Sequence, residues 1–273
     1  MDAKFQRRIQ RYGWDRAVVA YEQGWQAQLE PAHDLMLAIV APQRGERMLD
    51  VACGTGLVSL RLASAVGEQG CVIGTDISER MVETASSIAA GRDIRNAQFF
   101  RYDADAAPFP DASFDAAVCA LGLMYVPDPI GALREMRRLL RSGGRVAAAV
   151  WGARRRCGWA AVFPITDTRV ASDVCPLFFQ LGTGDTLALS MADAGFADIR
   201  LERMQTTLAY ASEDAALGAA FRGGPVALAY SRFDDATKQA VHGEYLDSIA
   251  AYRVGDGYRI PGEFVVAAAR APS

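Results

Sequence analysis

The sequence predicts an α/β protein with a doubly wound, mostly parallel sheet that is covered by helices on both faces. Three observations support this prediction. Between residues 47 and 151, short apolar runs alternate with longer segments of helical periodicity. The apolar runs are nearly continuous, as in strands that are buried on both faces. Glycine or aspartate follows several of these runs, where parallel strands end in turns that bind ligands.

The elements of this part follow one another in a regular order. Ser78 is placed to cap a helix, and Asp128 caps the next one with Pro129 at its first position. Gly91 ends one helix, and the glycines of 142–144 end another. The expected strands are 47–52, 71–76, 97–103, 114–120 and 145–151, and the expected helices are 57–66, 79–90 and the segment that Pro129 opens.

The segments on either side of this core have other patterns. Residues 3–40 are helical in periodicity, and Pro31 is expected to open a second helix, which gives N-terminal lid helices. After residue 151 the pattern loosens, although a helix and two further strands are still expected. These later elements are a helix at 186–196 and strands at 197–210 and 263–270. The expected parts of the chain are 1–40, a core at 41–151, and 152–273, with helical cap inserts at about 152–185 and 211–258.

Composition and charge limit the classes of function. Of 273 residues, 51% are hydrophobic and 22% are charged, which is typical of a globular domain with a sizeable core. A formal net charge of −3 opposes a nucleic-acid partner, which requires basic surface. No apolar stretch has the length of a membrane span. The five cysteines form no CxxC pair, so we expect no metal site, and we expect a cytoplasmic protein without a signal peptide.

The segment DVACGTGLVS, residues 50–59, has two glycines after the first expected strand, where a ligand can approach bare backbone. It has no lysine, which excludes a phosphate-binding P-loop. A dinucleotide fingerprint requires a third glycine, and Ser59 occupies that position. Asp76 ends the second expected strand, where an acid accepts hydrogen bonds from ribose hydroxyls. A nicotinamide oxidoreductase shares this last feature and stays open as an alternative.

Four separated motifs then occur in one order: LDVACGTG, GTDIS, DADAAPFPDASFD and LLRSGGRVAAAVW. In this order they resemble the class I S-adenosylmethionine-dependent methyltransferases, most of all the group related to ubiquinone/menaquinone C-methyltransferases. The resemblance covers about residues 45–151. It implies a Rossmann-like, seven-stranded sheet with an antiparallel last strand. It also implies that the chain transfers a methyl group from S-adenosylmethionine to a small acceptor molecule and releases S-adenosylhomocysteine.

The resemblance implies a role for particular residues. Gly54 and Gly56 would let the backbone approach the methionine part of the cofactor, and Asp50 would orient this loop. Asp76 would accept hydrogen bonds from the ribose, and Asp103 from the adenine amino group. The cofactor-binding residues implied in the core are Asp50, Ala52, Cys53, Gly54, Gly56, Asp76, Ile77, Met81, Asp103, Ala104, Cys119 and Leu121.

Residues outside the core are expected to complete the site. Tyr21 and Trp25 are four residues apart on one helix face, and we expect them to close the methionine end. His33 and His242 are candidate general bases, although a structural role is the alternative for each. The cap inserts hold aromatic residues that would form a pocket for a lipophilic or aromatic acceptor. These aromatic residues are Phe163, Phe178, Phe179, Phe221, Tyr230, Phe233, Tyr245 and Tyr252.

Other interpretations remain beside this one. Packing of the cap alone explains many of its aromatic residues. A protein that binds S-adenosylmethionine without catalysis, or uses it in non-methylating chemistry, is a second class of function, because a fold does not fix a function. The run CALGLMY after the fourth strand lacks the Asn/Asp-Pro-Pro-aromatic motif of nucleic-acid base methyltransferases. A homodimer is also an open expectation.

Overall fold

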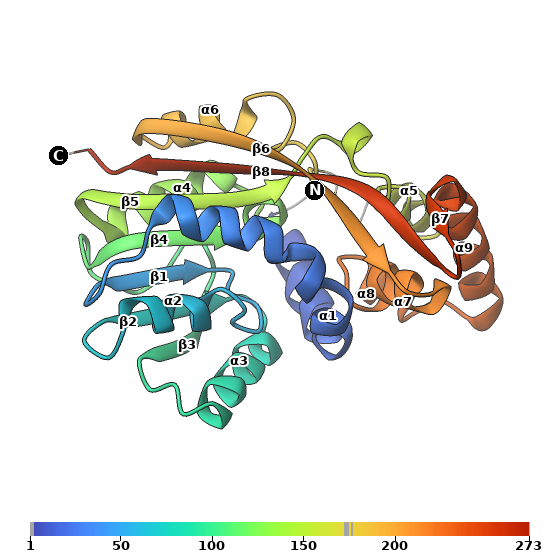
Figure 1. Ribbon diagram of the computed structural model, residues 1–273, viewed down its shortest axis with the longest axis horizontal. Coiled ribbons are helices and arrows are strands. Elements are labelled where there is room, and N and C mark those ends of the chain that lie inside the picture. Colours follow the sequence, from blue (N-terminus) through green and yellow to red (C-terminus); the bar gives the residue numbers. More distant parts are fainter. Residues whose placement is uncertain (1–2, 172–174, 176, 273) are drawn as a thin grey trace.

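The computed structural model describes residues 3–171, 175 and 177–272, and one mixed sheet lies at its centre (Figure 1). The strands are β1 (Arg47–Val51), β2 (Cys71–Asp76), β3 (Ala97–Arg101), β4 (Phe114–Ala120), β5 (Leu140–Trp151), β6 (Ala197–Tyr210), β7 (Arg253–Val254) and β8 (Gly257–Arg270). Their order is β3-β2-β1-β4-β5-β8-β6, with β7 paired to β8. β1 to β5 are parallel, whereas β8 is antiparallel to both β5 and β6. The predicted sheet with an antiparallel last strand is confirmed, and β7 is one short strand more than expected.

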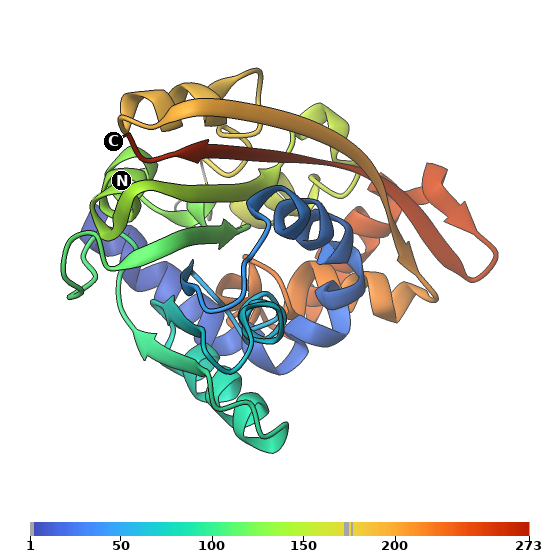
Figure 2. The same ribbon diagram turned by 60° about the vertical axis from the view of Figure 1, so that its left-hand side comes forward.

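Helices cover both faces of this sheet (Figures 1 and 2). The α-helices are α1 (Ala3–Val40), α2 (Ser59–Val66), α3 (Glu79–Gly91), α4 (Pro129–Leu139), α5 (Val162–Asp167), α6 (Thr186–Asp193), α7 (Glu213–Leu217), α8 (Ala227–Tyr230) and α9 (Asp235–Ser248). Short helical turns are Leu123–Tyr125, Arg154–Arg156, Gly218–Arg222 and Ala250–Tyr252. α1, α2 and α3 lie on one face and α4 and α6 on the other, while α5, α7, α8 and α9 gather beyond the carboxyl ends of the parallel strands.

The expected helix caps are present, but one helix is shorter than expected. The Ser78 hydroxyl accepts a hydrogen bond from Met81 N at 3.1 Å, and Asp128 accepts one from Gly131 N at 2.8 Å. The helix that Pro129 opens ends at Leu139, because Leu140 already pairs with Phe114 of β4. β5 therefore begins before the glycines that were expected to end the helix.

The expectation of two N-terminal helices was wrong, because α1 is one helix that continues through Pro31. A proline inside a helix removes a backbone hydrogen bond and destabilises the helix by about 3 kcal/mol. Leu29 is 4% exposed and Met36 fully buried on either side of it. Burial of one such side chain stabilises by about 1.5–3 kcal/mol, so packing of this turn on the sheet outweighs the lost bond.

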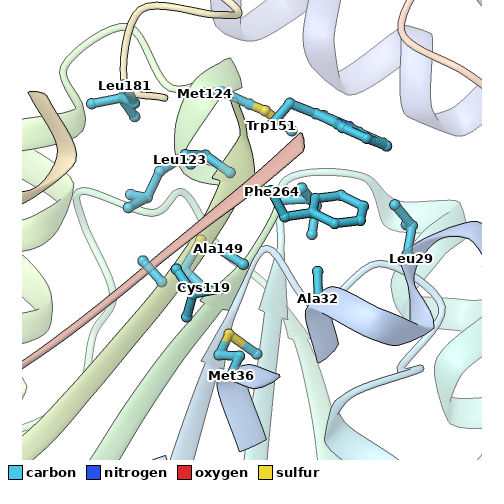
Figure 3. Close-up of a cluster of buried hydrophobic side chains, with 14 of the residues drawn as sticks. Leu29, Ala32, Met36, Cys119, Leu123, Met124, Ala149, Trp151, Leu181 and Phe264 are labelled. Atoms are coloured by element: carbon cyan, nitrogen blue, oxygen red, sulfur yellow. The ribbon is translucent and has the colours of Figure 1, made fainter. Parts of the chain in front are cut away.

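α1 packs across the face formed by β4, β5 and β8. Figure 3 shows its side chains, including Ala32 and Met36, facing Cys119 of β4, Ala149 of β5 and Phe264 of β8. The rings of Trp151 and Phe264 lie 4.2 Å apart between their centroids, so the end of β5 and the middle of β8 share this core. The alanines of the neighbouring strands let the helix approach closely.

β6 and β8 extend beyond the end of β5 as a two-stranded ribbon (Figure 1). The last pair between β5 and β8 joins Trp151 and Phe264, whereas β8 pairs with β6 as far as Tyr210 and Tyr258. β8 begins at Gly257, earlier than the expected 263, because the ribbon includes the residues before Phe264. The ribbon connects the sheet to the helices of the cap. None of the helices in the described part of the chain is long and apolar enough to cross a membrane.

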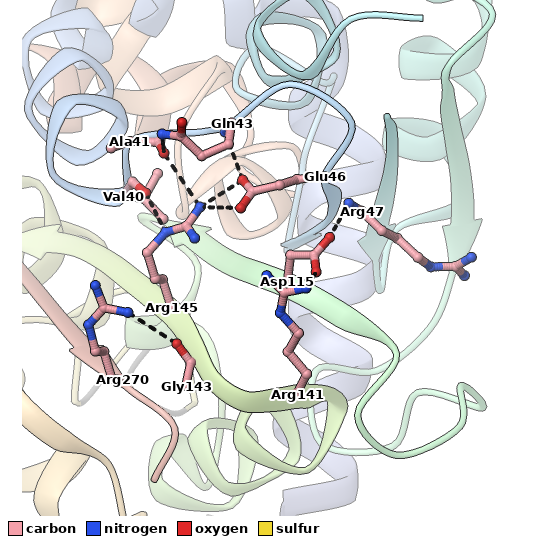
Figure 4. A network of polar contacts seen from close by, with 10 residues as sticks. All are labelled: Val40, Ala41, Gln43, Glu46, Arg47, Asp115, Arg141, Gly143, Arg145 and Arg270. Carbon is pink, nitrogen blue, oxygen red and sulfur yellow. Dashed lines mark hydrogen bonds and ion pairs between the residues drawn. The ribbon is translucent and has the colours of Figure 1, made fainter. Parts of the chain in front are cut away.

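The opposite end of the sheet is held by a buried ion pair (Figure 4). Arg145 of β5 donates to both oxygens of Glu46, at 2.9 and 2.7 Å, and to the carbonyl of Val40 at 2.8 Å. The exposed fractions of the Arg145 and Glu46 side chains are 19% and 9%. The pair joins the end of α1 to the start of β1 and to β5.

Replacement of Arg145 by alanine is expected to lower the free energy of unfolding by about 2–4 kcal/mol, because the Glu46 carboxylate then stays buried without its cation. Urea unfolding measures this change. Arg141→Ala is the matched control: its partner is Asp115, its side chain is 58% exposed, and a loss below about 1 kcal/mol is expected. Equal losses for the two variants would contradict the anchoring role of Arg145.

Candidate functional site

A cleft lies beyond the carboxyl ends of the parallel strands, between the strand-end loops, α1 and the cap. Its empty space is about 960 Å³, part of which is open to solvent. Most of the predicted cofactor-binding residues line it. They are Tyr21, Trp25, Ala52, Gly54, Asp76, Ile77, Met81, Asp103, Ala104 and Leu121.

The glycine loop after β1 has backbone that ordinary residues rarely adopt. Ala52 and Gly54 both have φ of 56°, and Leu121 at the end of β4 has φ of 59°. Left-handed backbone at non-glycine residues is uncommon and is found disproportionately at functional sites. A Cβ atom on Gly54 would meet only the ring of Tyr21, at 3.9 Å, so the loop exposes bare backbone to the cleft. Gly122 keeps the two turns together, because a Cβ there would lie 2.4 Å from that of Ala52.

Asp76 joins the glycine loop to the start of α3. One carboxylate oxygen accepts from Gly54 N at 2.9 Å, and the other accepts from Ser78 N at 2.8 Å. Burial raises the pKa of Asp76 to about 6, and these backbone hydrogen bonds only partly oppose that rise. Each oxygen keeps a further lone pair, so this carboxylate is placed to accept hydrogen bonds from a ligand in the cleft.

Asp103 and Ala104 line the next part of the cleft, after β3. Arg7 of α1 places its Nε atom 2.7 Å from the Asp103 carboxylate and also pairs with Asp105. Desolvation and the neighbouring Asp105 raise the pKa of Asp103, while Arg7 opposes the rise. The first turns of α1 are therefore fixed to this wall by charge.

Four predicted cofactor residues lie outside the cleft lining. Asp50 is buried beneath the loop, where one oxygen accepts from Ser59 Oγ at 2.6 Å and the other has no partner in the described part of the chain. Cys53 is bonded through its N–H to Thr75, and Cys119 lies fully in the core. Gly56 is required by packing, because a Cβ there would lie 3.3 Å from Phe99 and Ala85.

Both histidines lie away from the cleft. His33 lies on the buried face of α1 and is 5% exposed, and burial lowers its pKa to about 4, which is typical of a neutral, structural histidine. His242 on α9 lies 3.0 Å from the Tyr230 hydroxyl and stacks on that ring. Neither residue lines the cleft, so neither is placed to take a proton from a molecule bound there.

The aromatic residues of the cap have a different arrangement from the expected pocket. Among the eight, only Phe178 lines the cleft. Phe163 and Phe179 pack against it, while Phe221 packs on Tyr245 in a separate cluster. Packing of the cap accounts for these side chains, as the alternative interpretation held.

The apolar end of the cleft instead combines three tryptophans from distant segments. Trp25 of α1, Trp151 of β5 and Trp159 of the first cap insert meet with ring centroids 4.9–6.0 Å apart. Of these three tryptophans, only Trp25 was predicted from the sequence. Trp151 and Trp159 were missed because their contact with Trp25 depends on how α1 crosses the sheet. Other lining residues that were missed include Arg7, Gln10, Trp14, Tyr102, Met124 and Tyr125. The spacing of Arg7, Gln10, Trp14, Tyr21, Trp25 and Leu29 along one face of a helix was the available signal.

No group of three or more His, Cys, Asp or Glu residues in the described ranges is arranged to hold a metal ion. All five cysteines are free thiols.

Comparisons with known proteins match the core of the chain. Residues 48–144 match the family described as "Methyltransferase domain", which confirms the resemblance for this segment. A demethylmenaquinone methyltransferase from Listeria monocytogenes is 36% identical over 127 residues, which are 46% of this chain and 54% of that protein. Aklanonic acid methyltransferase DauC from a Streptomyces strain is 39% identical over 112 residues, 41% of this chain and 51% of that protein.

The chain spans about half the length of the curated relatives it matches. Among solved structures, the [4+2]-cyclase SpnF is similar over 91% of this chain and 84% of its own, with a TM-score of 0.58 and 23% sequence identity. At that identity the similarity concerns the fold alone. It extends over the core, the lid helix and the cap together.

Proposed function

We propose, on the premise that residues 48–144 form a methyltransferase domain, that this chain transfers a methyl group from S-adenosylmethionine to a small acceptor molecule. The observation that carries the proposal is the geometry at the ends of β1 and β2. There the exposed backbone of Gly54 and the carboxylate of Asp76 face one cleft and are bonded to each other. This pair offers a nucleoside both close approach and a charged acceptor for its hydroxyls.

The residues present fit this cofactor in three respects. Asp76 keeps free lone pairs for the ribose hydroxyls, and Ile77 and Met81 provide an apolar wall for adenine. Asp50 has a buried oxygen without a partner in the described chain, directly beneath the loop. Burial raises the pKa of Asp50 to about 7, and in its ionised form this carboxylate places negative charge on the side where the cation of the methionine part would lie.

The chain's own contribution to the reaction is binding, orientation and exclusion of water. S-adenosylmethionine supplies a methyl group that is already activated as a sulfonium substituent. The tryptophan end of the cleft holds the acceptor beside it, and alignment of this kind contributes several kcal/mol, up to about 7–11, to lowering a barrier. Among the described lining residues, the charged ones are Arg7, Asp76 and Asp103, all in the cofactor half. We therefore assign no general base, and the acceptor's own nucleophilic atom attacks.

We propose a lipophilic or aromatic acceptor. The rings of Trp25, Trp151 and Trp159 support this proposal, because they favour a flat apolar molecule. The names of the relatives, which refer to demethylmenaquinone and aklanonic acid, point in the same direction. A small-molecule role in a reducing cytoplasm agrees with the free cysteines and the net charge of −3, and a homodimer stays a prediction.

A second candidate is binding of S-adenosylmethionine for non-methylating chemistry. The chain is similar in fold to a protein named as a [4+2]-cyclase. This similarity favours keeping the second candidate, because a protein with the same architecture bears the name of an enzyme of another class.

The deciding experiment uses S-adenosylmethionine labelled in its methyl group, incubated with the protein and cell metabolites separated into organic-soluble and aqueous fractions. Label in an organic-soluble product supports methyl transfer to a lipophilic acceptor. Label only in aqueous products overturns the acceptor proposal. Confirmed cofactor binding without transfer in either fraction favours the non-methylating candidate.

Asp76→Asn is expected to weaken S-adenosylmethionine binding about 10- to 100-fold, because charged hydrogen bonds to the ribose are lost. In the native protein the carboxylate carries its charge above a pH of about 6. Affinity should therefore be full near pH 8 and fall as the pH drops through 6, by up to about tenfold per pH unit. Calorimetry at several pH values measures both effects. Asp111→Asn, at an exposed carboxylate, is the control, and an unchanged affinity in Asp76→Asn would refute the assigned role.

Gly54→Ala is expected to reduce S-adenosylmethionine affinity more than tenfold, because the new methyl group enters the cleft where the loop exposes its backbone. Gly45→Ala is the matched control. Gly45 also has left-handed backbone, with φ of 83°, and a Cβ there meets nothing within 4 Å. Both variants should lose about 1–2 kcal/mol of stability from this backbone strain, and only the first should lose affinity. Similar affinities in both would show that the loop does not approach the cofactor.

A further inference from the structure

The apolar end of the cleft holds few groups that bond to a polar ligand. Its walls are Trp25, Leu29, Met124, Trp151, Trp159 and Phe178. The charged lining residues lie at the other end, near the glycine loop and Arg7. A charged acceptor would lose its hydration here without gaining a counter-ion, so this end favours a neutral molecule.

Two polar groups in these walls have no partner. The Trp159 indole N–H is buried without an acceptor among the residues that the structure describes. Tyr125 lines the cleft, and its hydroxyl forms no hydrogen bond with a described residue. Trp159 is 2% exposed. The Trp25 N–H, in contrast, donates to the carbonyl of Ala219 at 3.1 Å. A buried polar group is normally paired, so the unpaired Trp159 N–H beside the cleft indicates that the bound molecule supplies its partner. The Tyr125 hydroxyl, on the same lining, is available to bond to that molecule.

The Tyr125 ring is held in place by segments that are far apart in the sequence. It meets Trp14 of α1 edge-to-face at 5.0 Å between centroids, and Phe178 of the cap at 5.4 Å. Its backbone carbonyl accepts from Gln6 Nε2 at 3.5 Å. Burial holds the pKa of Tyr125 well above its usual range, so the hydroxyl keeps its proton and acts as a donor rather than a base.

The indole N–H can only donate, and the neutral Tyr125 hydroxyl can donate as well as accept, so both groups can donate to a bound molecule. Building on the proposed methyl transfer, we propose that Tyr125 determines acceptor specificity: its hydroxyl donates a hydrogen bond to an oxygen of a neutral ring that lies against the tryptophan cluster. The site then selects an oxygen-bearing ring over the bare hydrocarbon, because only the oxygen satisfies the donor. Tyr125 acts on binding and orientation and takes no proton.

The test is a binding experiment on the protein loaded with S-adenosylhomocysteine, so it does not depend on turnover. The probes are 1-tetralone, whose carbonyl can only accept, and tetralin, which has the same rings without oxygen. In Tyr125→Phe we expect 1-tetralone affinity to fall about 3- to 10-fold and tetralin affinity to stay unchanged. Tyr12→Phe removes the hydroxyl of an exposed tyrosine of α1 that does not line the cleft, and it should change neither affinity.

Equal changes for the two probes in Tyr125→Phe, or no change for either, would overturn the proposal, as would absence of 1-tetralone binding to the native protein. The infrared carbonyl stretch of bound 1-tetralone in the native protein is an independent measurement that needs no variant. A hydrogen bond lowers this frequency, and an unshifted band would also refute the proposal. Failure of methyl transfer in the labelling experiment bears on the proposed function and leaves these binding results unaffected.

Discussion

Burial of one long helix on two different surfaces is the constraint on which the rest of the structure depends. The second half of α1 covers β4, β5 and β8, while its first half forms a wall of the cleft. Because the helix is continuous, the position of the wall follows from packing on the sheet. Arg145 and Glu46 fix the far end of the helix, and Arg7 fixes the near end to Asp103. Loss of either contact should therefore change the position of the cleft wall that α1 forms.

Much of the fold could be predicted from the sequence, because the parallel core has strong local signals. The strand ends and the caps Ser78 and Asp128 follow from patterns within a short stretch, whereas the antiparallel last strand was implied by the resemblance to a known family. The incorrect predictions concern residues at which contacts with distant parts of the chain outweigh the local sequence preference. Pro31 looks like a helix start, yet burial of its neighbours on the sheet carries the helix through it. Leu140 looks helical, yet pairing with Phe114 makes it strand.

The candidate site likewise contains residues that could be predicted from the sequence and residues that could not. Gly54, Asp76 and Asp103 could be predicted because each lies at the end of a strand or within three residues after it, and strand ends of a parallel sheet meet at one edge. Trp159 and Tyr125 could not, since their place in the cleft depends on how the cap folds back over α1. The cap aromatics show the limit of composition as evidence, because most of them pack with one another and only Phe178 reaches the cleft.

The position of β8 between β5 and β6 has a consequence for the order of assembly during synthesis. β6 leaves the ribosome before β8, but it has no partner in the sheet until β8 arrives. The last stretch of the chain therefore closes the sheet and brings the cap to the cleft in a single late event. Pairings so distant in sequence form slowly, and until then β5 presents an open edge. In a nascent chain, the edge of β5 therefore stays open to pairing with other strands until β8 has been made.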